Sequence, residues 1–174
     1  SMGLDLAEGG PDVKLTLTDE QMMLAQSVAR FVADAEGRIS PAGSFVSAYD
    51  PELWQQIADL GWLSAGVTEA AGGFGGPREM AVIMEGAAST PLAAQIAPIF
   101  LALNILEAAG AAEGTVAEVI AGGSIACAVL PEMASAIDLT GTGASKRLSG
   151  RFRAIPMGDV AERFVVALPQ VTLL

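Results

Sequence analysis

The sequence predicts an α+β protein with segregated elements: an N-terminal all-α helical bundle followed by an incomplete β-barrel or β-sandwich domain. Apolar residues recur at the 3.6-residue spacing of helices to about residue 121, and the period changes to two after Gly122-Gly123. The charge balance changes too, since residues 1–145 hold 4 basic and 18 acidic residues and residues 146–174 hold 5 basic and 2 acidic ones. Helices and strands separated along a chain form separate layers rather than βαβ units.

Residues 1–14 are set apart from the fold. Ser1-Met2-Gly3 is typical of a cleaved expression tag, and the rest of the segment is polar and glycine-rich, as in a flexible tail. It lacks the basic and apolar regions of a secretory signal. We therefore predict a tail over 1–14, a helical domain over 15–122 and the start of a truncated β domain over 123–174.

The first helix is predicted to begin after Thr18, because Gln21 stands three positions later, as in a capping box. Gly37 and Pro41 end it. Its apolar side chains repeat at helical spacing and are Leu24, Val28, Phe31, Val32 and Ala35. The methionines of the helical part are interpreted as core filling, namely Met22, Met23, Met80 and Met84.

The second helix opens at Asp50-Pro51, an N-cap followed by proline at the first helical position, and Gly61 ends it. Trp54 and Trp62 are expected in the core. The following loop, 62–76, is dense in glycine. A tight connection is favoured there over a phosphate-binding loop, because the P-loop lysine and a preceding strand are both lacking.

Three more helices are predicted over about 77–89, 91–109 and 112–121. The middle one is apolar nearly all round, which predicts a position inside a bundle. Its uncharged part, 91–106, is about 16 residues long, shorter than the roughly 20 residues of a membrane span. A buried helix of a protein without a membrane span is therefore favoured.

Three strands are predicted after residue 123. Residues 124–130 are apolar throughout, as in a buried strand. Residues 147–154 alternate between polar and apolar, as in a half-buried strand, and 164–168 form another apolar run. Cys127, in the first strand, is interpreted as a buried inert thiol.

Composition excludes several kinds of chemistry. The chain has no histidine and one cysteine, which excludes a Ser-His-Asp triad, a Cys-His pair, a histidine-ligated metal and an internal disulfide. The formal net charge of −11 argues against nucleic acid as a partner. A free thiol without a signal segment favours the cytoplasm.

Several features, taken in order, resemble the acyl-CoA dehydrogenase family over residues 15–174. Each is common alone, and the order and spacing carry the resemblance. They are Leu17-Thr18-Asp19-Glu20-Gln21, Trp54, Ala58-Asp59-Leu60-Gly61-Trp62, Val67, Glu69, Gly72-Gly73, Gly75-Gly76, Glu79, Val82-Ile83-Met84-Glu85, Pro91-Leu92 and Ile120-Ala121-Gly122. A helical interaction module outside the family is a remaining alternative.

The resemblance implies an oxidoreductase of fatty acid or lipid metabolism. Such a flavoprotein desaturates an acyl-CoA thioester between Cα and Cβ, with a carboxylate as base and FAD as hydride acceptor. It further implies electron-transferring flavoprotein as a partner and a homotetramer or heterotetramer. The family's base lies in a later helical bundle, so no catalytic residue is assigned here. The sequence is expected to be an N-terminal portion that is inactive alone.

The resemblance also marks Leu130, Ile155 and Pro156 as the cofactor-binding positions. Members often carry Ala-x-Thr-Glu-Pro after the first strand, where this chain has Ala128-Val129-Leu130-Pro131-Glu132. They also often carry Trp-Ile-Thr or Trp-Ile-Ser beside the flavin, where this chain has Ala154-Ile155-Pro156. Loss of the hydroxyl and the tryptophan motivates an alternative: a non-catalytic partner subunit of a heteromeric dehydrogenase that has lost its flavin site.

Two interpretations of the basic strand stay open. Arg147, Arg151 and Arg153 share one face by alternation, and arginine suits the phosphate groups that CoA and FAD carry. A solvent-facing strand that uses arginine to protect its sheet would give the same pattern.

Overall fold

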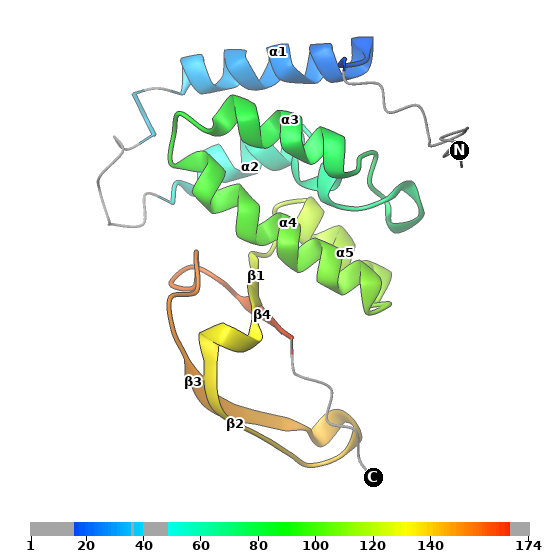
Figure 1. The fold of residues 1–174 in the computed structure, drawn as a ribbon, viewed down its shortest axis with the longest axis vertical. Coiled ribbons are helices and arrows are strands. Elements are labelled where there is room, and N and C mark those ends of the chain that lie inside the picture. The colour runs from blue at the N-terminus through cyan, green and yellow to red at the C-terminus, as the bar shows by residue number, and fades with distance from the viewer. Residues whose placement is uncertain (1–15, 36, 40–48, 168–174) are drawn as a thin grey trace, which may run out of the picture.

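The computed structural model describes residues 16–35, 37–39 and 49–167. Within these residues, five α-helices come first, and four strands follow in two unclosed sheets (Figure 1). The helices are α1 (Asp19–Asp34), α2 (Pro51–Asp59), α3 (Pro77–Ala87), α4 (Leu92–Ala108) and α5 (Glu113–Ile120). The strands are β1 (Ala126–Val129), β2 (Ala134–Thr140), β3 (Arg147–Phe152) and β4 (Arg163–Val166). The predicted α+β fold class, with helices before strands, is confirmed.

The capping box of α1 forms as predicted and also fixes α1 on α3. The Gln21 backbone N–H donates to Thr18 Oγ1 at 3.2 Å, and the Thr18 N–H donates to Gln21 Oε1 at 3.1 Å. Gln21 is buried, and its Nε2 donates to Glu79 Oε1 on α3 at 2.8 Å. One side chain therefore caps its own helix and pairs with the next layer. Pro41, predicted to end this helix, lies outside the described residues.

Asp50 caps α2 with its carboxylate. Its Oδ1 accepts from the N–H groups of Glu52 at 3.0 Å and Leu53 at 3.1 Å, and its Oδ2 accepts from Arg38 Nη2 at 2.6 Å. The backbone hydrogen bond from Leu53, followed by the bond from Arg38, lowers the pKa of Asp50 below its ordinary value. The predicted N-cap is confirmed.

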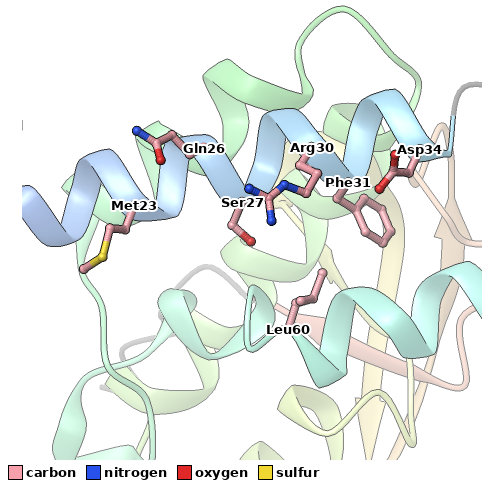
Figure 2. Close-up of a pocket in the computed structure, with 7 residues that line it drawn as sticks. All are labelled: Met23, Gln26, Ser27, Arg30, Phe31, Asp34 and Leu60. Atoms are coloured by element: carbon pink, nitrogen blue, oxygen red, sulfur yellow. The ribbon is translucent and has the colours of Figure 1, made fainter.

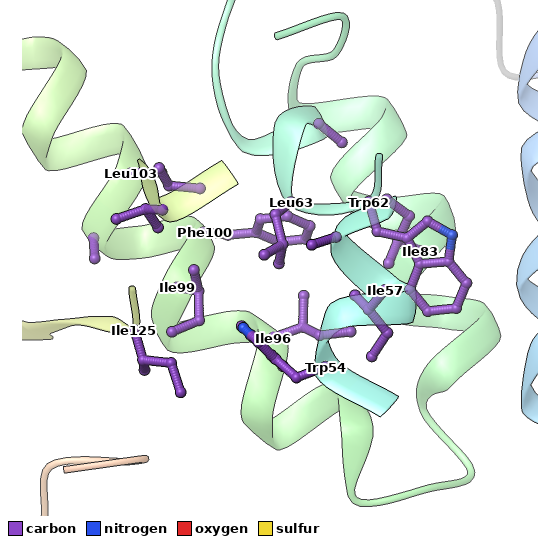
Figure 3. Packing of buried hydrophobic residues seen from close by; sticks show 14 of the residues in the cluster. Trp54, Ile57, Trp62, Leu63, Ile83, Ile96, Ile99, Phe100, Leu103 and Ile125 are labelled. Atoms are coloured by element: carbon purple, nitrogen blue, oxygen red, sulfur yellow. The ribbon is translucent and has the colours of Figure 1, made fainter. Parts of the chain in front are cut away.

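The core lies between α2, α3 and α4 and continues onto β1 (Figure 3). Trp62, Ile57, Ile83 and Ile96 are fully buried there. Trp54, 2% exposed, joins them, so both tryptophans are core residues as predicted. Burial of such side chains stabilises a fold by about 1.5–3 kcal/mol each.

The glycine-dense segment makes tight turns between α2 and α3. It holds two 3₁₀ helices, Leu63–Gly66 and Glu69–Ala71, and the second ends at Gly72 with φ 87°. A Cβ on Gly73 would lie 2.1 Å from the Val67 carbonyl oxygen, so no side chain fits. Close backbone approach therefore explains Gly73, and the left-handed φ explains Gly72.

Helix α4 packs against α3, β1 and the first 3₁₀ helix, but one stripe of it faces outward. Its exposed positions are Ala94, Ala97, Leu101, Asn104 and Ala108. The expectation of a wholly interior helix is therefore only partly right. Within the described residues, no helix has both the length and the apolar character required to cross a membrane.

The strands form two pairs. Parallel β1 and β4 place Cys127 beside Phe164, and antiparallel β2 and β3 form a hairpin that places Leu139 beside Leu148. An irregularity in β2 between Ser135 and Asp138 accommodates the one extra residue of a bulge, where Ala136 has φ 53°. Strand β2 was not predicted, and Leu168 of the last predicted run lies outside the described residues.

Two further expectations are corrected. All six residues of β3 are exposed, although alternation predicted a half-buried strand. The described residues supply no layer against its apolar face, and alternation alone cannot reveal this. Met22 and Met23 are 44% and 62% exposed rather than core residues, and Met23 lines a surface pocket together with Leu60. Met80 and Met84 do pack on the core.

Candidate functional site

A shallow pocket lies between α1 and the end of α2 (Figure 2). Its volume is about 330 Å³, and its lining is Met23, Gln26, Ser27, Arg30, Phe31, Asp34 and Leu60. The α1 residues recur at spacings of three and four, which places them on one side of the helix. Leu60 is the C-terminal cap of α2, so the pocket is formed by residues from both helices.

The chemistry of this pocket is that of a binding surface. Its lining includes Phe31, whose ring packs edge-on against buried Trp62 at a centroid distance of 5.0 Å. Met23 and Leu60 expose 62% and 47% of their surface there. Arg30 and Asp34 add one charge of each sign, and the lining holds no histidine or cysteine. The pocket can therefore receive an apolar group, and sequence reasoning missed it by placing Met23 in the core.

A second cavity, of about 340 Å³, lies where the helices meet the strands. It is lined by Leu106, Thr115, Ala126, Arg163, Phe164 and Val165. Arg163 pairs with Glu118 on α5 and donates from Nε to Ser124 Oγ at 3.1 Å, so its charge is engaged in fastening β4 to the helices. Apart from Arg163 and Thr115, the residues that line this cavity are apolar.

The structure brings the sequence-predicted cofactor positions to one end of the β2–β3 hairpin. Leu130 follows β1 and is half-buried, and its carbonyl accepts from Met133 N–H at 2.9 Å. Ile155 is half-buried and packs on the core, whereas Pro156 is exposed. The Arg153 N–H donates to the Met133 carbonyl at 2.9 Å, which holds the two segments at the same hairpin end.

The donor set at these positions does not fit a flavin. The flavin ring has a polar edge of nitrogen and oxygen atoms, which a protein normally matches with hydrogen-bond groups. The side chains of Leu130 and Ile155 have no polar atom, and Pro156 lacks even a backbone N–H. These residues can contact an apolar ring face but cannot recognise the polar edge through their side chains.

The remaining candidate groups offer no reactive centre. Cys127 is fully buried, and burial, followed by the negative charge of Asp159, raises the pKa of its thiol to about 11. The prediction of a buried thiol is therefore confirmed, and the raised pKa makes it a poor nucleophile. Within the described ranges, no group of three or more His, Cys, Asp or Glu side chains is arranged to hold a metal ion. Arg147, Arg151 and Arg153 are exposed on β3 and just beyond it.

Comparison with known proteins gives one family and one solved structure. The family model described as acyl-CoA dehydrogenase, N-terminal domain, matches residues 18–115. The Tcur3481-Tcur3483 steroid acyl-CoA dehydrogenase, in a variant form, superposes with a TM-score of 0.67 at 22% identity over 87% of this chain. The match covers 45% of that protein's chain, so this chain spans less than half of its length. No curated protein shows significant similarity.

Proposed function

The chain belongs to the acyl-CoA dehydrogenase family, and we propose that the protein takes part in the α,β-desaturation of an acyl-CoA thioester with FAD as hydride acceptor. The observation that carries this proposal is the family match over residues 18–115, which span α1 to the first residues of α5. The strands that follow the helices agree with the order of the family's domains. No catalytic base is assigned to this chain.

We propose that residues 15–122 form the helical domain and 123–174 the start of the β domain. The change from α5 to β1 between residues 120 and 126 supports this boundary. Arg163 joins the two parts through its pair with Glu118 and its bond to Ser124. The contribution of this chain is then architectural: it supplies one wall of the assembly in which the thioester binds.

The proposal extends to partners. Electron-transferring flavoprotein is the proposed acceptor of electrons from the reduced flavin. The proposed assembly is a homotetramer or a heterotetramer, and the proposed location is the cytoplasm. The pocket between α1 and α2 supports a protein partner in general terms, because two apolar residues of its lining, Met23 and Leu60, are exposed.

A second candidate is a non-catalytic subunit that pairs with a flavin-bearing subunit. The specific observation that favours it is the donor set at Leu130, Ile155 and Pro156, which does not match the polar edge of a flavin. On this proposal the hydride acceptor lies in the partner subunit, and this chain shapes the assembly around it.

The flavin content of the purified full-length protein tests both candidates. An oxidised flavin absorbs near 370 and 450 nm (approximate values for the cofactor). If the first candidate is right, the subunit that contains this chain shows those bands after separation from any partner, and the protein desaturates an acyl-CoA. A colourless subunit that copurifies with a yellow partner, and is required for the partner's activity, supports the second candidate. A colourless protein without such a partner and without effect on desaturation contradicts both.

A further inference from the structure

The β2–β3 hairpin has two unlike faces. In an antiparallel pair, directly opposite residues share a face and successive residues alternate. The register therefore gives an apolar face of Ala134, Leu139, Leu148 and Phe152. It gives a polar face of Ser135, Asp138, Thr140, Arg147, Ser149 and Arg151. The apolar face is the one that further layers of a β domain would cover, which leaves the polar face in water.

The polar face extends past the end of β3. The Arg153 N–H donates to the Met133 carbonyl at 2.9 Å, so the hairpin ladder continues by one pair, and alternation places Arg153 on the side of Arg151. Both arginines and Arg147 are exposed. Among the described residues, none of the three forms an ion pair or a side-chain hydrogen bond, whereas Arg38 and Arg163 are each paired with carboxylates.

The net charge of the segment around these arginines is positive, whereas that of the whole chain is negative. Residues 146–153 hold 4 of the 9 basic residues and no acidic one, although the whole chain has a formal net charge of −11. A pyrophosphate together with a phosphate monoester carries roughly −3.5 to −4 charges near pH 7. The field of an acidic protein repels such a ligand, so its binding requires a local group of cations.

We propose that Arg151 and Arg153, assisted by Arg147, bind the phosphate groups of the CoA part of the substrate; this inference rests on the proposed function. Residues two apart on a strand lie about 6.6 Å apart, which lets two guanidinium groups engage separate phosphates of one nucleotide. Guanidinium groups bind phosphate oxygens in a bidentate manner. The hydroxyls of Ser135, Ser149 and Thr140 on the same face add hydrogen-bond donors.

One carboxylate opposes this binding and gives a sharp control. Asp138 lies opposite Ser149, diagonally beside Arg147 and Arg151 on the same face. It repels a phosphate and attracts the arginines. Its replacement by asparagine should therefore strengthen binding of CoA.

Isothermal titration calorimetry on the full-length protein, with any copurifying subunit, tests the proposal with CoA, 3′-dephospho-CoA, pantetheine and FAD as ligands. We expect Arg151→Ala combined with Arg153→Ala to weaken CoA about tenfold or more and to reduce the salt dependence of binding. Asp138→Asn should tighten CoA about twofold. Lys146→Ala is the matched control, because alternation directs this side chain to the other face of the hairpin. It removes one positive charge and should change the affinity for CoA less than about twofold. Circular dichroism melting checks that these exposed substitutions leave the fold intact.

Each result decides for or against the site. An ordered loss of affinity from CoA to 3′-dephospho-CoA to pantetheine, abolished in the double variant, supports it. Equal CoA affinity in the double variant and the wild type overturns the arginine site and leaves the proposed function standing. An arginine dependence seen for FAD but not for CoA overturns it in favour of the flavin's own phosphates. Absence of CoA binding and of desaturation by the wild-type assembly overturns the proposed function and this inference together.

Discussion

The helical core and the β2–β3 hairpin differ in what their apolar residues touch. Trp62 and Ile57 are 0% exposed between helices, whereas Leu139 and Leu148 are 48% and 38% exposed on the hairpin. Both regions carry regular apolar patterns, yet only the helical one is matched by a facing layer within the described residues. The apolar periodicity of the sequence therefore indicates which side of a helix or strand is suited to burial. Whether that side is buried depends on a facing layer in the folded protein.

The largest difference between the two regions is expected from removal of a core ring. Trp62→Ala should lower the free energy of unfolding by about 3–5 kcal/mol, because it leaves a cavity and removes the edge-on contact with Phe31. Chemical denaturation followed by far-ultraviolet circular dichroism measures it. A loss below about 1 kcal/mol would contradict the packing described for α2 and α3.

A pair of glycine substitutions sharpens the comparison within the helical region. Gly73→Ala places a Cβ 2.1 Å from a backbone oxygen and should destabilise the protein by about 2 kcal/mol or more. Gly114→Ala, in α5, meets no atom within 4 Å and should stabilise it by about 0.5–1 kcal/mol. Thermal unfolding of both variants measures the difference. Equal effects would show that the 62–76 turns are looser than described.

A smaller, pH-dependent effect is expected at Asp50. Its pKa is lowered in the folded state, so its contribution to stability is present above the unfolded value of about 3.9 and is lost as the pH falls through the lower folded value. Asp50→Asn keeps a capping oxygen but loses the charge, so its melting temperature should fall less between pH 5 and pH 3 than that of the wild type. Parallel pH dependences would exclude this contribution.

The smallest effect is expected on the hairpin. Leu148→Ser should change the free energy of unfolding by less than about 0.5 kcal/mol, because this leucine is 38% exposed and lacks a facing layer within the described residues. The same denaturation experiment measures it. A loss above about 1 kcal/mol in residues 1–174 alone would contradict this exposure, whereas a larger loss in the full-length protein is what coverage of the apolar face by further β layers predicts.

Local signals predicted the helices well. The capping box at Thr18 and Gln21 and the Asp50-Pro51 start depend on atoms within a few residues, so the sequence contains all the information needed. Strand β2 has no comparable signal. It forms because its partner β3 lies across a short connection, and the irregularity at Ala136 breaks the alternation that would have marked it.

The candidate sites divide in the same way. The chemical character of Leu130, Ile155 and Pro156 can be read directly from the sequence, and the structure adds that the two segments meet at one hairpin end. The pocket between α1 and α2 could not be predicted, because it needs Leu60 of one helix beside Phe31 of another. Its only trace in the sequence is a second, mixed stripe on α1.

The sequence by itself determined the order of helices before strands, the helix starts, the core tryptophans and the family, since these follow from local propensity and from residue order. Only the tertiary structure decided which apolar faces are buried. Exposure of Met23, of one stripe of α4 and of the whole of β3 depends on which surfaces meet in space. Burial is a property of two surfaces together, and a periodic pattern describes only one of them.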